Sequence, residues 1–360
     1  MDLSTSQLLI SGHDTVEVAY YLNLGVGAAL DFDRLMAMRD SLKESKSRNP
    51  AVVKLGSEEF LLASHGTKSG YPLLLENESF SVQCGEFNQP SFFVTYRSIA
   101  LWHFGLDNLH QRFLDWSKSV GLYVRQAEKV SRMDYAFDYH LPSLDFDEDN
   151  FVSNFIKDNQ HRSNRVVQTF RLGLGDLVLR CYNKSDEIKE SSSKIWLYDL
   201  WGRESDVWRI EWQARKEWLR NYGIKTVSDL QSNQGQLLQF LVNEHTKLCL
   251  KSSDSNRSRW PLHPLWLDLQ EQVKKLPSIG LDRDLNMDSL LNERLMRITI
   301  SVYGYLKRVA AIQSLQGNTA PASLTKAQFS LSRQLNRIHD PLTWESDVQR
   351  RMNEMRLGEW

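Results

Sequence analysis

Cysteine is scarce in this chain, whose 360 residues include only Cys84, Cys181 and Cys249. The three are far apart, odd in number and without CxxC spacing, which argues against a disulfide framework and a cysteine zinc site. No apolar run approaches the roughly 18 residues of a membrane-spanning helix. The N-terminal segment lacks the basic and apolar regions of a secretory signal peptide. We therefore expect a protein of the reducing cytoplasm with no membrane partner.

An excess of charge of either sign is also missing. Lys and Arg total 44 and Asp and Glu total 45, so the formal net charge is −1. A domain that merely coats nucleic acid is usually more basic. If nucleic acid is the partner, the basic residues must gather on one surface and be offset by acids elsewhere, such as those at 145–149. Hydrophobic residues make up 41% of the chain, which is enough for a sizeable core.

The first 215 or so residues mix strand and helix patterns. Residues 14–22 and 91–97 are rich in strand formers. Residues 31–44 and 107–120 place apolar side chains at helical spacing. Residues 165–184 predict a hairpin, with two strand-like runs around a glycine-bearing turn at 173–176.

Beyond about residue 222 the strand alternation disappears. Residues 228–250, 286–315 and 323–338 predict helices, and 251–264 is a polar, proline-containing stretch typical of a linker. We therefore expect two domains, 1–222 and 223–360, of which the second is mainly helical.

Three strand-like segments, 131–140, 177–184 and 206–215, each alternate between a mainly apolar face and a polar face. A solvated sheet face is the common meaning of such alternation in one strand. Here the three polar faces together carry an unusual combination of carboxylates, arginines, one tyrosine and one lysine. These residues are Arg132, Asp134, Asp138, Arg180, Tyr182, Lys184, Arg209, Glu211 and Arg215.

These residue types suit the cleavage of a phosphodiester bond. Carboxylate oxygens select Mg²⁺ or Mn²⁺, which would polarise the scissile phosphate, and arginines match the geometry of phosphate. Tyr182 is the candidate nucleophile. Its hydroxyl would ordinarily titrate near ~10, so a cation such as the metal or Lys184 is needed to favour the phenolate. Attack would leave a phosphotyrosine that conserves the bond energy for rejoining.

Three short motifs in this region resemble those of a known family. Residues 132–138 (RMDYAFD) match RxDxAxD, residues 181–184 (CYNK) contain YxK, and residues 209–215 (RIEWQAR) match RxExxxR. In this order and spacing they resemble the Rep_trans family of rolling-circle replication initiators, which includes plasmid and filamentous-phage initiators and conjugative relaxases. The resemblance runs from about residue 14 to residue 220.

The resemblance implies an α+β fold related to the HUH endonucleases, with a central antiparallel sheet. It implies a nick that leaves a 5′-phosphotyrosine and a free 3′-OH to prime synthesis. The implied catalytic residues are Tyr182, Lys184 and Arg215, and the implied ligands of Mg²⁺ or Mn²⁺ are Asp134, Asp138, Glu211 and Asp14. Two features depart from some members of the family. Asp186 stands where a second tyrosine would, and no His-hydrophobic-His motif appears.

The expected partner is origin DNA, single-stranded or extruded at the nick site, and a second copy of the chain and a host helicase or polymerase are further candidates. The 223–360 region would then contact DNA or protein. Tyr198 and Tyr222 are rival nucleophiles, and Trp201 is a candidate for stacking on unpaired bases. Three rival functions stay open: a relaxase with the same chemistry, a non-catalytic DNA-binding regulator, and a hydrolase that uses water instead of tyrosine.

Overall fold

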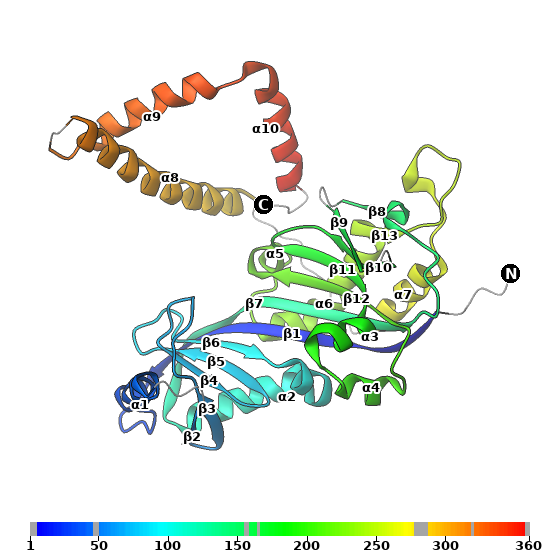
Figure 1. Cartoon of the computed structure of the whole chain (residues 1–360), viewed down its shortest axis with the longest axis horizontal. Helices are drawn as coiled ribbons and strands as arrows, with labels where there is room; N and C mark the ends of the chain where they lie inside the picture. The colour runs from blue at the N-terminus through cyan, green and yellow to red at the C-terminus, as the bar shows by residue number, and fades with distance from the viewer. Residues whose placement is uncertain are drawn as a thin grey trace. The chain divides into compact units, whose positions relative to one another are not determined.

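The computed structural model describes residues 6–45, 50–154, 158–163, 166–276, 287–317 and 320–356. They divide into two compact units, Met1–Asp282 and Arg283–Trp360. In the described residues the first unit is built on an 11-stranded antiparallel sheet with helices packed on it, and the second unit is helical (Figure 1). The expected α+β class, with a central antiparallel sheet followed by helices, is confirmed.

The order of strands across the sheet differs from their order in the chain. From one edge to the other the strands are β2 (Ala51–Leu55), β3 (Glu58–Leu62), β4 (Leu73–Glu76), β5 (Phe80–Cys84), β6 (Phe92–Tyr96), β1 (Gln7–Leu24), β7 (Leu122–His140), β12 (Val207–Arg215), β11 (Leu177–Asn183), β10 (Val166–Leu172) and β9 (Asp158–Ser163). A separate pair joins β8 (Phe151–Ser153) to β13 (Thr246–Leu248). Strands β2 to β5 were not predicted from the sequence.

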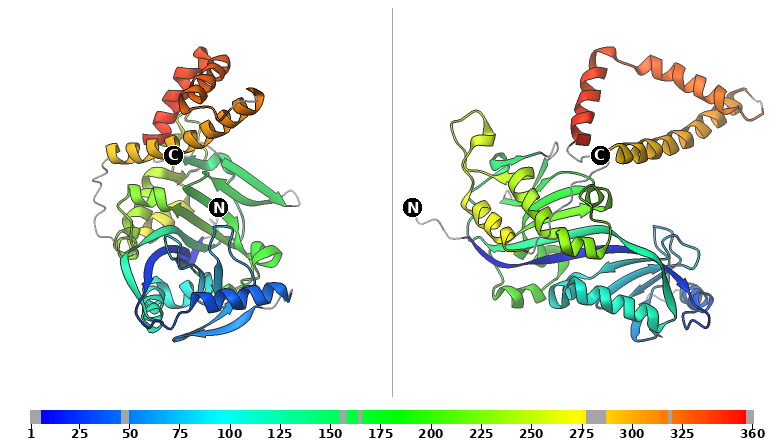
Figure 2. Two further views of the ribbon diagram at one scale, coloured as in Figure 1. Left: turned by 90° about the vertical axis from the view of Figure 1, so that its left-hand side faces the viewer. Right: turned by 180° about the vertical axis from the view of Figure 1, so that it is seen from behind.

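Two long neighbouring strands, β1 and β7, connect the two halves of the sheet (Figure 2). The sequence predicted only parts of them, residues 14–22 of β1 and the second half of β7 at 131–140. On one side of the pair lie β2 to β6, and on the other lie β9 to β12. The pairing register shifts between His13 and Thr15, which makes Asp14 an irregular position in mid-strand. Such a bulge can change the direction in which a side chain points.

Several helices of the first unit begin at a residue whose side chain caps the helix. The helices of this unit are α1 (Phe32–Glu44), α2 (Ser98–Ser119), α3 (Lys184–Glu187), α4 (Trp196–Trp201), α5 (Lys216–Asn221), α6 (Val227–Phe240) and α7 (Pro264–Lys274). The side chain of Asp31 accepts a hydrogen bond at the start of α1, and Thr226 with Asp229 forms a capping box at α6. The helix expected at 107–120 is the second part of α2, which is kinked at Gly105.

The expected boundary at residue 222 lies inside the first unit. Helices α6 and α7 belong to the same hydrophobic core as the sheet, since Leu238, Trp266 and Leu269 are buried with Trp212 of β12. The rings of Trp212 and Trp266 lie 5.8 Å apart. The helix expected at 228–250 is also shorter than predicted, because α6 is followed by a π-helical turn and then by β13.

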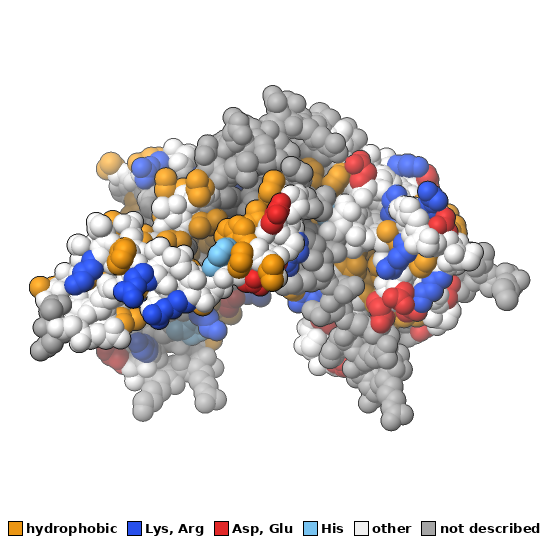
Figure 3. Space-filling view, turned by 90° about the horizontal axis from the view of Figure 1, so that it is seen from above, with side chains coloured by type: hydrophobic (Ala, Val, Ile, Leu, Met, Phe, Trp, Pro, Cys, Tyr) orange, Lys and Arg blue, Asp and Glu red, His pale blue; other side chains and the backbone are white. Residues whose placement is uncertain are grey.

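The second unit contains α8 (Met287–Gly317), α9 (Leu324–Ile338) and α10 (Pro341–Arg356). The first two were expected at 286–315 and 323–338, whereas α10 was not. Basic and hydrophobic side chains are both exposed on these helices, and Figure 3 shows the two kinds mixed on the surface of the molecule seen from above. Examples on the helices are Lys307, Arg308, Ile312, Phe329 and Arg333. Among the described residues, no helix has the length and apolar character needed to cross a membrane.

Candidate active site

The pairing register brings the three sequence motifs onto one face of the sheet. Residues directly opposite each other on antiparallel strands share a face. Arg209 on β12 lies opposite Asp138 of β7 on one side and Tyr182 of β11 on the other. Two positions further along β12, Glu211 lies opposite Ala136 and Arg180. We call this surface, which also carries Asp134, the polar face.

Tyr182 is half-buried on the polar face, and its hydroxyl donates a hydrogen bond of 3.1 Å to Oε2 of Glu211. Burial raises the pKa of this phenol well above 10, and the Glu211 carboxylate raises it further, while the Arg209 guanidinium opposes both. The hydroxyl is therefore protonated in the free protein. Glu211 is in position to accept the proton when Tyr182 reacts.

Lys184 lies outside strand β11, in which its spacing from Tyr182 had placed it. The strand ends at Asn183, and Lys184 is the first residue of α3. Its buried ammonium donates a hydrogen bond of 2.5 Å to Glu187 and lies 5.6 Å from the centre of the Tyr182 ring. Burial lowers the pKa of the ammonium, and Arg209 and Lys194 lower it further. Lys184 therefore lies close to Tyr182, as expected. It approaches the tyrosine from the start of α3 and not from within the strand.

Asp134 and Glu211 are carboxylates that influence each other across the polar face. Glu211 accepts a hydrogen bond of 2.8 Å from Arg180, and Asp134 accepts two, of 2.8 and 2.5 Å, from Arg132. Burial raises the pKa of Asp134 to about 6, and the negative charge of Glu211 contributes in the same direction despite Arg132. Arg132 thus offsets the effects of burial and of Glu211 on Asp134 only in part, and an added cation would stabilise the charged carboxylate further.

Asp138 makes an ion pair that occupies its whole carboxylate. It is fully buried, and Arg209 donates to both of its oxygens, at 2.6 and 2.8 Å. Trp201 donates a third hydrogen bond, of 2.9 Å, through its indole nitrogen. The suggestion that Trp201 stacks on unpaired bases is wrong, because the residue is buried over Asp138.

Asp14 is held by a second set of cations. Its carboxylate accepts hydrogen bonds from Arg209 at 2.7 Å and from Lys194 at 3.1 Å. Ser98 and Trp102, both on α2, donate two more. Burial acts to raise the pKa of Asp14, but Arg209 and Lys194 outweigh it and hold this pKa far below its usual range.

The arrangement divides the four predicted metal ligands into two pairs. Asp138 and Asp14 accept hydrogen bonds from Arg209, whereas Glu211 lies 3.9 Å from that arginine and diagonally across from Asp134 on the adjacent strand. Within the part of the chain that the structure describes, no group of three or more His, Cys, Asp or Glu side chains is placed to hold a metal. The pair of Asp134 and Glu211 suits Mg²⁺, which commonly takes one or two carboxylates and completes its shell with water and phosphate oxygens.

Arg215 is distant from the tyrosine. It is exposed at the end of β12, opposite Arg132, and is four residues from Glu211. At about 3.3 Å per residue this separation is roughly 13 Å along the strand. The structure therefore does not bring Arg215 into contact with Tyr182, and its place suits a contact with a more distant part of a DNA strand.

Arg209 is the site residue whose role sequence reasoning missed. It was recognised as a phosphate-matching side chain of the third motif, but it is fully buried and binds two carboxylates. The rival nucleophiles lie elsewhere. Tyr198 packs against Trp201 in α4, and Tyr222 packs against Trp218.

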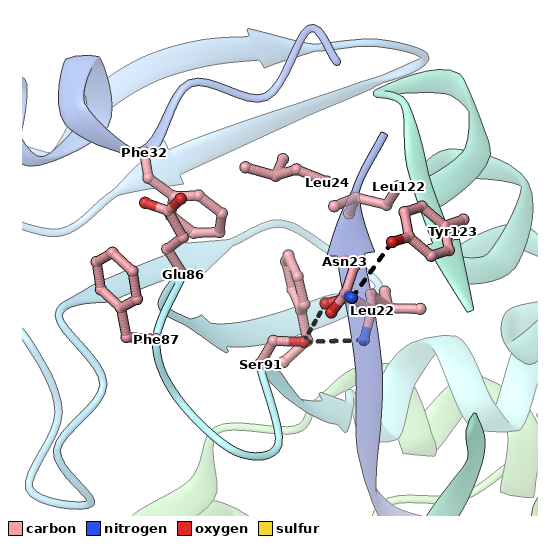
Figure 4. Close-up of a pocket in the computed structure, with 10 residues that line it drawn as sticks. Leu22, Asn23, Leu24, Phe32, Glu86, Phe87, Ser91, Leu122 and Tyr123 are labelled. Carbon is pink, nitrogen blue, oxygen red and sulfur yellow. Dashed lines mark hydrogen bonds between the residues drawn. The ribbon is translucent and has the colours of Figure 1, made fainter. Parts of the chain in front are cut away.

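A pocket of about 290 Å³ lies near the other end of β1 (Figure 4). Its lining includes Leu22, Phe32 and Phe92, with Glu86 at its rim. Glu86 is the single charged residue of the lining, so this pocket does not suit a phosphate group. It is separate from the polar face.

No family model matches the chain, and no curated protein matches it. Among solved structures, it is similar to the rolling circle replication initiator protein from Geobacillus stearothermophilus, with 17% identity and a TM-score of 0.45. The match covers 76% of this chain and 98% of that chain. A likeness at this level says nothing about individual site residues, and the family stays a prediction from the motifs.

Proposed function

We propose that this chain initiates rolling-circle replication by nicking one DNA strand with Tyr182. The observation that carries the proposal is the hydrogen bond from the Tyr182 hydroxyl to Glu211, on a face where three predicted motifs meet. A tyrosine beside a carboxylate acceptor has both parts of an activated nucleophile. Arginines on the same face supply the cations that a phosphate group requires.

In the proposed reaction the Tyr182 oxygen attacks the phosphorus of a DNA phosphodiester. A bond forms between this oxygen and phosphorus, and the bond from phosphorus to the 3′ oxygen breaks. The phenolic proton passes to the Glu211 carboxylate, and the departing 3′ oxygen takes a proton from solvent. The products are a 5′-phosphotyrosine and a 3′-OH end. Lys184 and Arg209 favour the charged form of the attacking oxygen through their nearby positive charges.

We propose that Mg²⁺ or Mn²⁺ assists this reaction and that Asp134 and Glu211 hold it. When bound, the ion would stabilise negative charge that develops on the phosphate oxygens. Asp138 and Asp14, which both bind Arg209, are instead assigned to positioning that arginine beside Tyr182 on the adjacent strand. The helices α8 to α10 are proposed to supply contacts with DNA or with protein partners, since they expose both basic and apolar side chains.

The test is the formation of a covalent protein–DNA adduct. Purified protein is incubated with supercoiled DNA that carries its own gene and flanks, with Mg²⁺ or Mn²⁺, and the products are separated on a denaturing gel. We expect an adduct with the wild type and with Tyr198→Phe, and none with Tyr182→Phe. An adduct that persists in Tyr182→Phe would place the nucleophile elsewhere. Cleavage without any adduct would favour a hydrolase, and binding without cleavage would favour a regulator.

A further inference from the structure

The strand beside Tyr182 carries an arginine that lies in none of the three motifs. Strand β10 pairs with β11, with Thr169 opposite Tyr182 and Arg171 opposite Arg180. Arg171 and Arg180 are therefore cross-strand neighbours on the polar face, two positions along from the tyrosine. At about 3.3 Å per residue, this places them roughly 7 Å along the strands from the nucleophile.

The two arginines have very different surroundings. Arg180 donates hydrogen bonds to Glu211 at 2.8 Å and to Gln213 at 2.6 Å, and both acceptors are on β12. Its guanidinium therefore leans toward β12 and away from Arg171. Arg171 is half-buried, and among the side chains that the structure describes none accepts a hydrogen bond from its buried Nε.

This arrangement is unfavourable in the free protein for two reasons. Like charges directly opposite each other on adjacent strands destabilise a sheet. A buried donor without an acceptor also costs its desolvation free energy. An anion bound to Arg171 and to the part of the Arg180 guanidinium that Glu211 and Gln213 do not occupy would offset the repulsion between the two positive charges. Guanidinium groups bind phosphate with two parallel hydrogen bonds, which makes phosphate a fitting anion.

We infer that Arg171 and Arg180 form a subsite for a DNA phosphate adjacent to the one that Tyr182 attacks. The inference rests on the proposed function, because it takes its ligand from the DNA strand that would be nicked. The subsite would hold the strand in register across β10 and β11 while the scissile phosphate lies over Tyr182 and Glu211. Arg171 would thus act as a positioning residue, with no part in bond formation.

The test measures binding alone, so that its result does not depend on nicking. Fluorescein-labelled oligo(dT) of 20 nucleotides is titrated with the Tyr182→Phe protein, without divalent metal, at several salt concentrations between 50 and 200 mM. The plot of log affinity against log salt has a negative slope. Adding Arg171→Gln is expected to make this slope shallower by about 0.7, the value for one lost contact with a single-strand phosphate. Arg171→Lys should retain most of the slope and lose affinity.

The matched control is Arg34→Gln, which removes an exposed arginine on α1. We expect its slope to equal that of the parent protein. An unchanged slope in Arg171→Gln, or an equal fall in both variants, would overturn the subsite. Urea denaturation separates binding from folding. Loss of the like-charge pair should leave Arg171→Gln as stable as the parent or more stable, and marked destabilisation would show that Arg171 has a structural role instead.

If no adduct forms in the nicking assay but the slope still falls in Arg171→Gln, the phosphate subsite stands and the tyrosine mechanism fails. If an adduct forms and the slope is unchanged, the reverse holds. The two proposals therefore fail separately.

Discussion

The two ends of the polar face contain the same kinds of residue in opposite conditions. At the sealed end, formed by Asp14, Asp138 and Arg209, every carboxylate faces a buried cation. At the open end, formed by Asp134, Glu211 and the arginines around them, the two carboxylates also repel each other. The pKa of Asp14 is held far below its usual range, whereas that of Asp134 is raised to about 6. Burial is similar for the two aspartates, so the geometry of the neighbouring charges decides the direction.

The sealed end is closed by the segment that follows Tyr182. This segment contains α3 and α4, and its Trp201 and Lys194 bind Asp138 and Asp14. A small hydrophobic cluster that includes Ile188 and Leu197 holds it in place. The residues that follow the nucleophile in the chain thus complete the structural support beside it and leave the open end to a ligand.

The largest effect on stability is expected at the sealed end. Arg209→Met leaves Asp138 and Asp14 buried without their main cation, and breaking a buried ion pair in this way costs about 3–5 kcal/mol. Urea denaturation measures the change. Arg180→Met removes a partly exposed arginine from the open end and leaves its buried acceptors on Glu211 and Gln213 without that donor, so it should cost less, about 1–3 kcal/mol. Equal losses in the two variants would contradict the distinction between the ends.

The largest effect on activity at the open end, apart from loss of Tyr182 itself, is expected at Glu211. Glu211→Gln retains a hydrogen-bond acceptor for the tyrosine but cannot take its proton or bind a cation as strongly. A fall of about 10²–10⁴-fold in the nicking rate is expected, the range for loss of a general base. Glu58→Gln is the matched control, since Glu58 is also bound by an arginine but lies on β3. A nicking rate close to wild type in Glu211→Gln would remove Glu211 from the mechanism.

Asp134→Asn should make the metal-free protein more stable and less active. Because the folded-state pKa of about 6 lies above the ordinary value of 3.8, the charged carboxylate opposes folding at neutral pH. The gain from the substitution is expected to reach up to about 3 kcal/mol at pH 7 and to shrink to about 1 kcal/mol at pH 4.5, where the folded wild type is already protonated. Urea denaturation at both pH values checks this. Asp138→Asn should be destabilising at pH 7, and a stabilising result would contradict the assignment of the sealed end.

The smallest effect is expected at Arg215, at the far end of β12. Arg215→Gln should change the stability by less than about 0.5 kcal/mol, because the side chain is exposed. If Arg215 contacts a DNA phosphate, the salt slope of single-strand binding falls by about 0.7, while the nicking rate at saturating DNA stays close to wild type. A large fall in the rate at saturation would instead require Arg215 to act at the reacting phosphate.

Much of the site was predictable from local patterns. The alternation in residues 131–140, 177–184 and 206–215 identified three strands and the face on which their polar residues lie, and the glycines of the turn identified the hairpin. Trp208 and Trp212 were correctly expected in the core. These predictions depend on the two-residue period of a strand and on the backbone freedom of glycine, both of which are local properties.

Other features required contacts between distant parts of the chain. The sequence indicated a boundary near 222 because strand patterns end there, yet α6 and α7 return to the sheet and share its core. Strands β2 to β5 were missed, and so was the burial of Trp201.

By itself, the sequence determined that each of the three strands would gather its polar residues on one of its two faces, because side-chain direction in a strand follows from the backbone. Only the tertiary structure decided which carboxylates pair with Arg209 and which remain beside Tyr182. That choice depends on strand order, on the bulge at Asp14 and on the segment that closes over Asp138. These are long-range features, and they set the burial and the neighbouring charges from which each pKa follows.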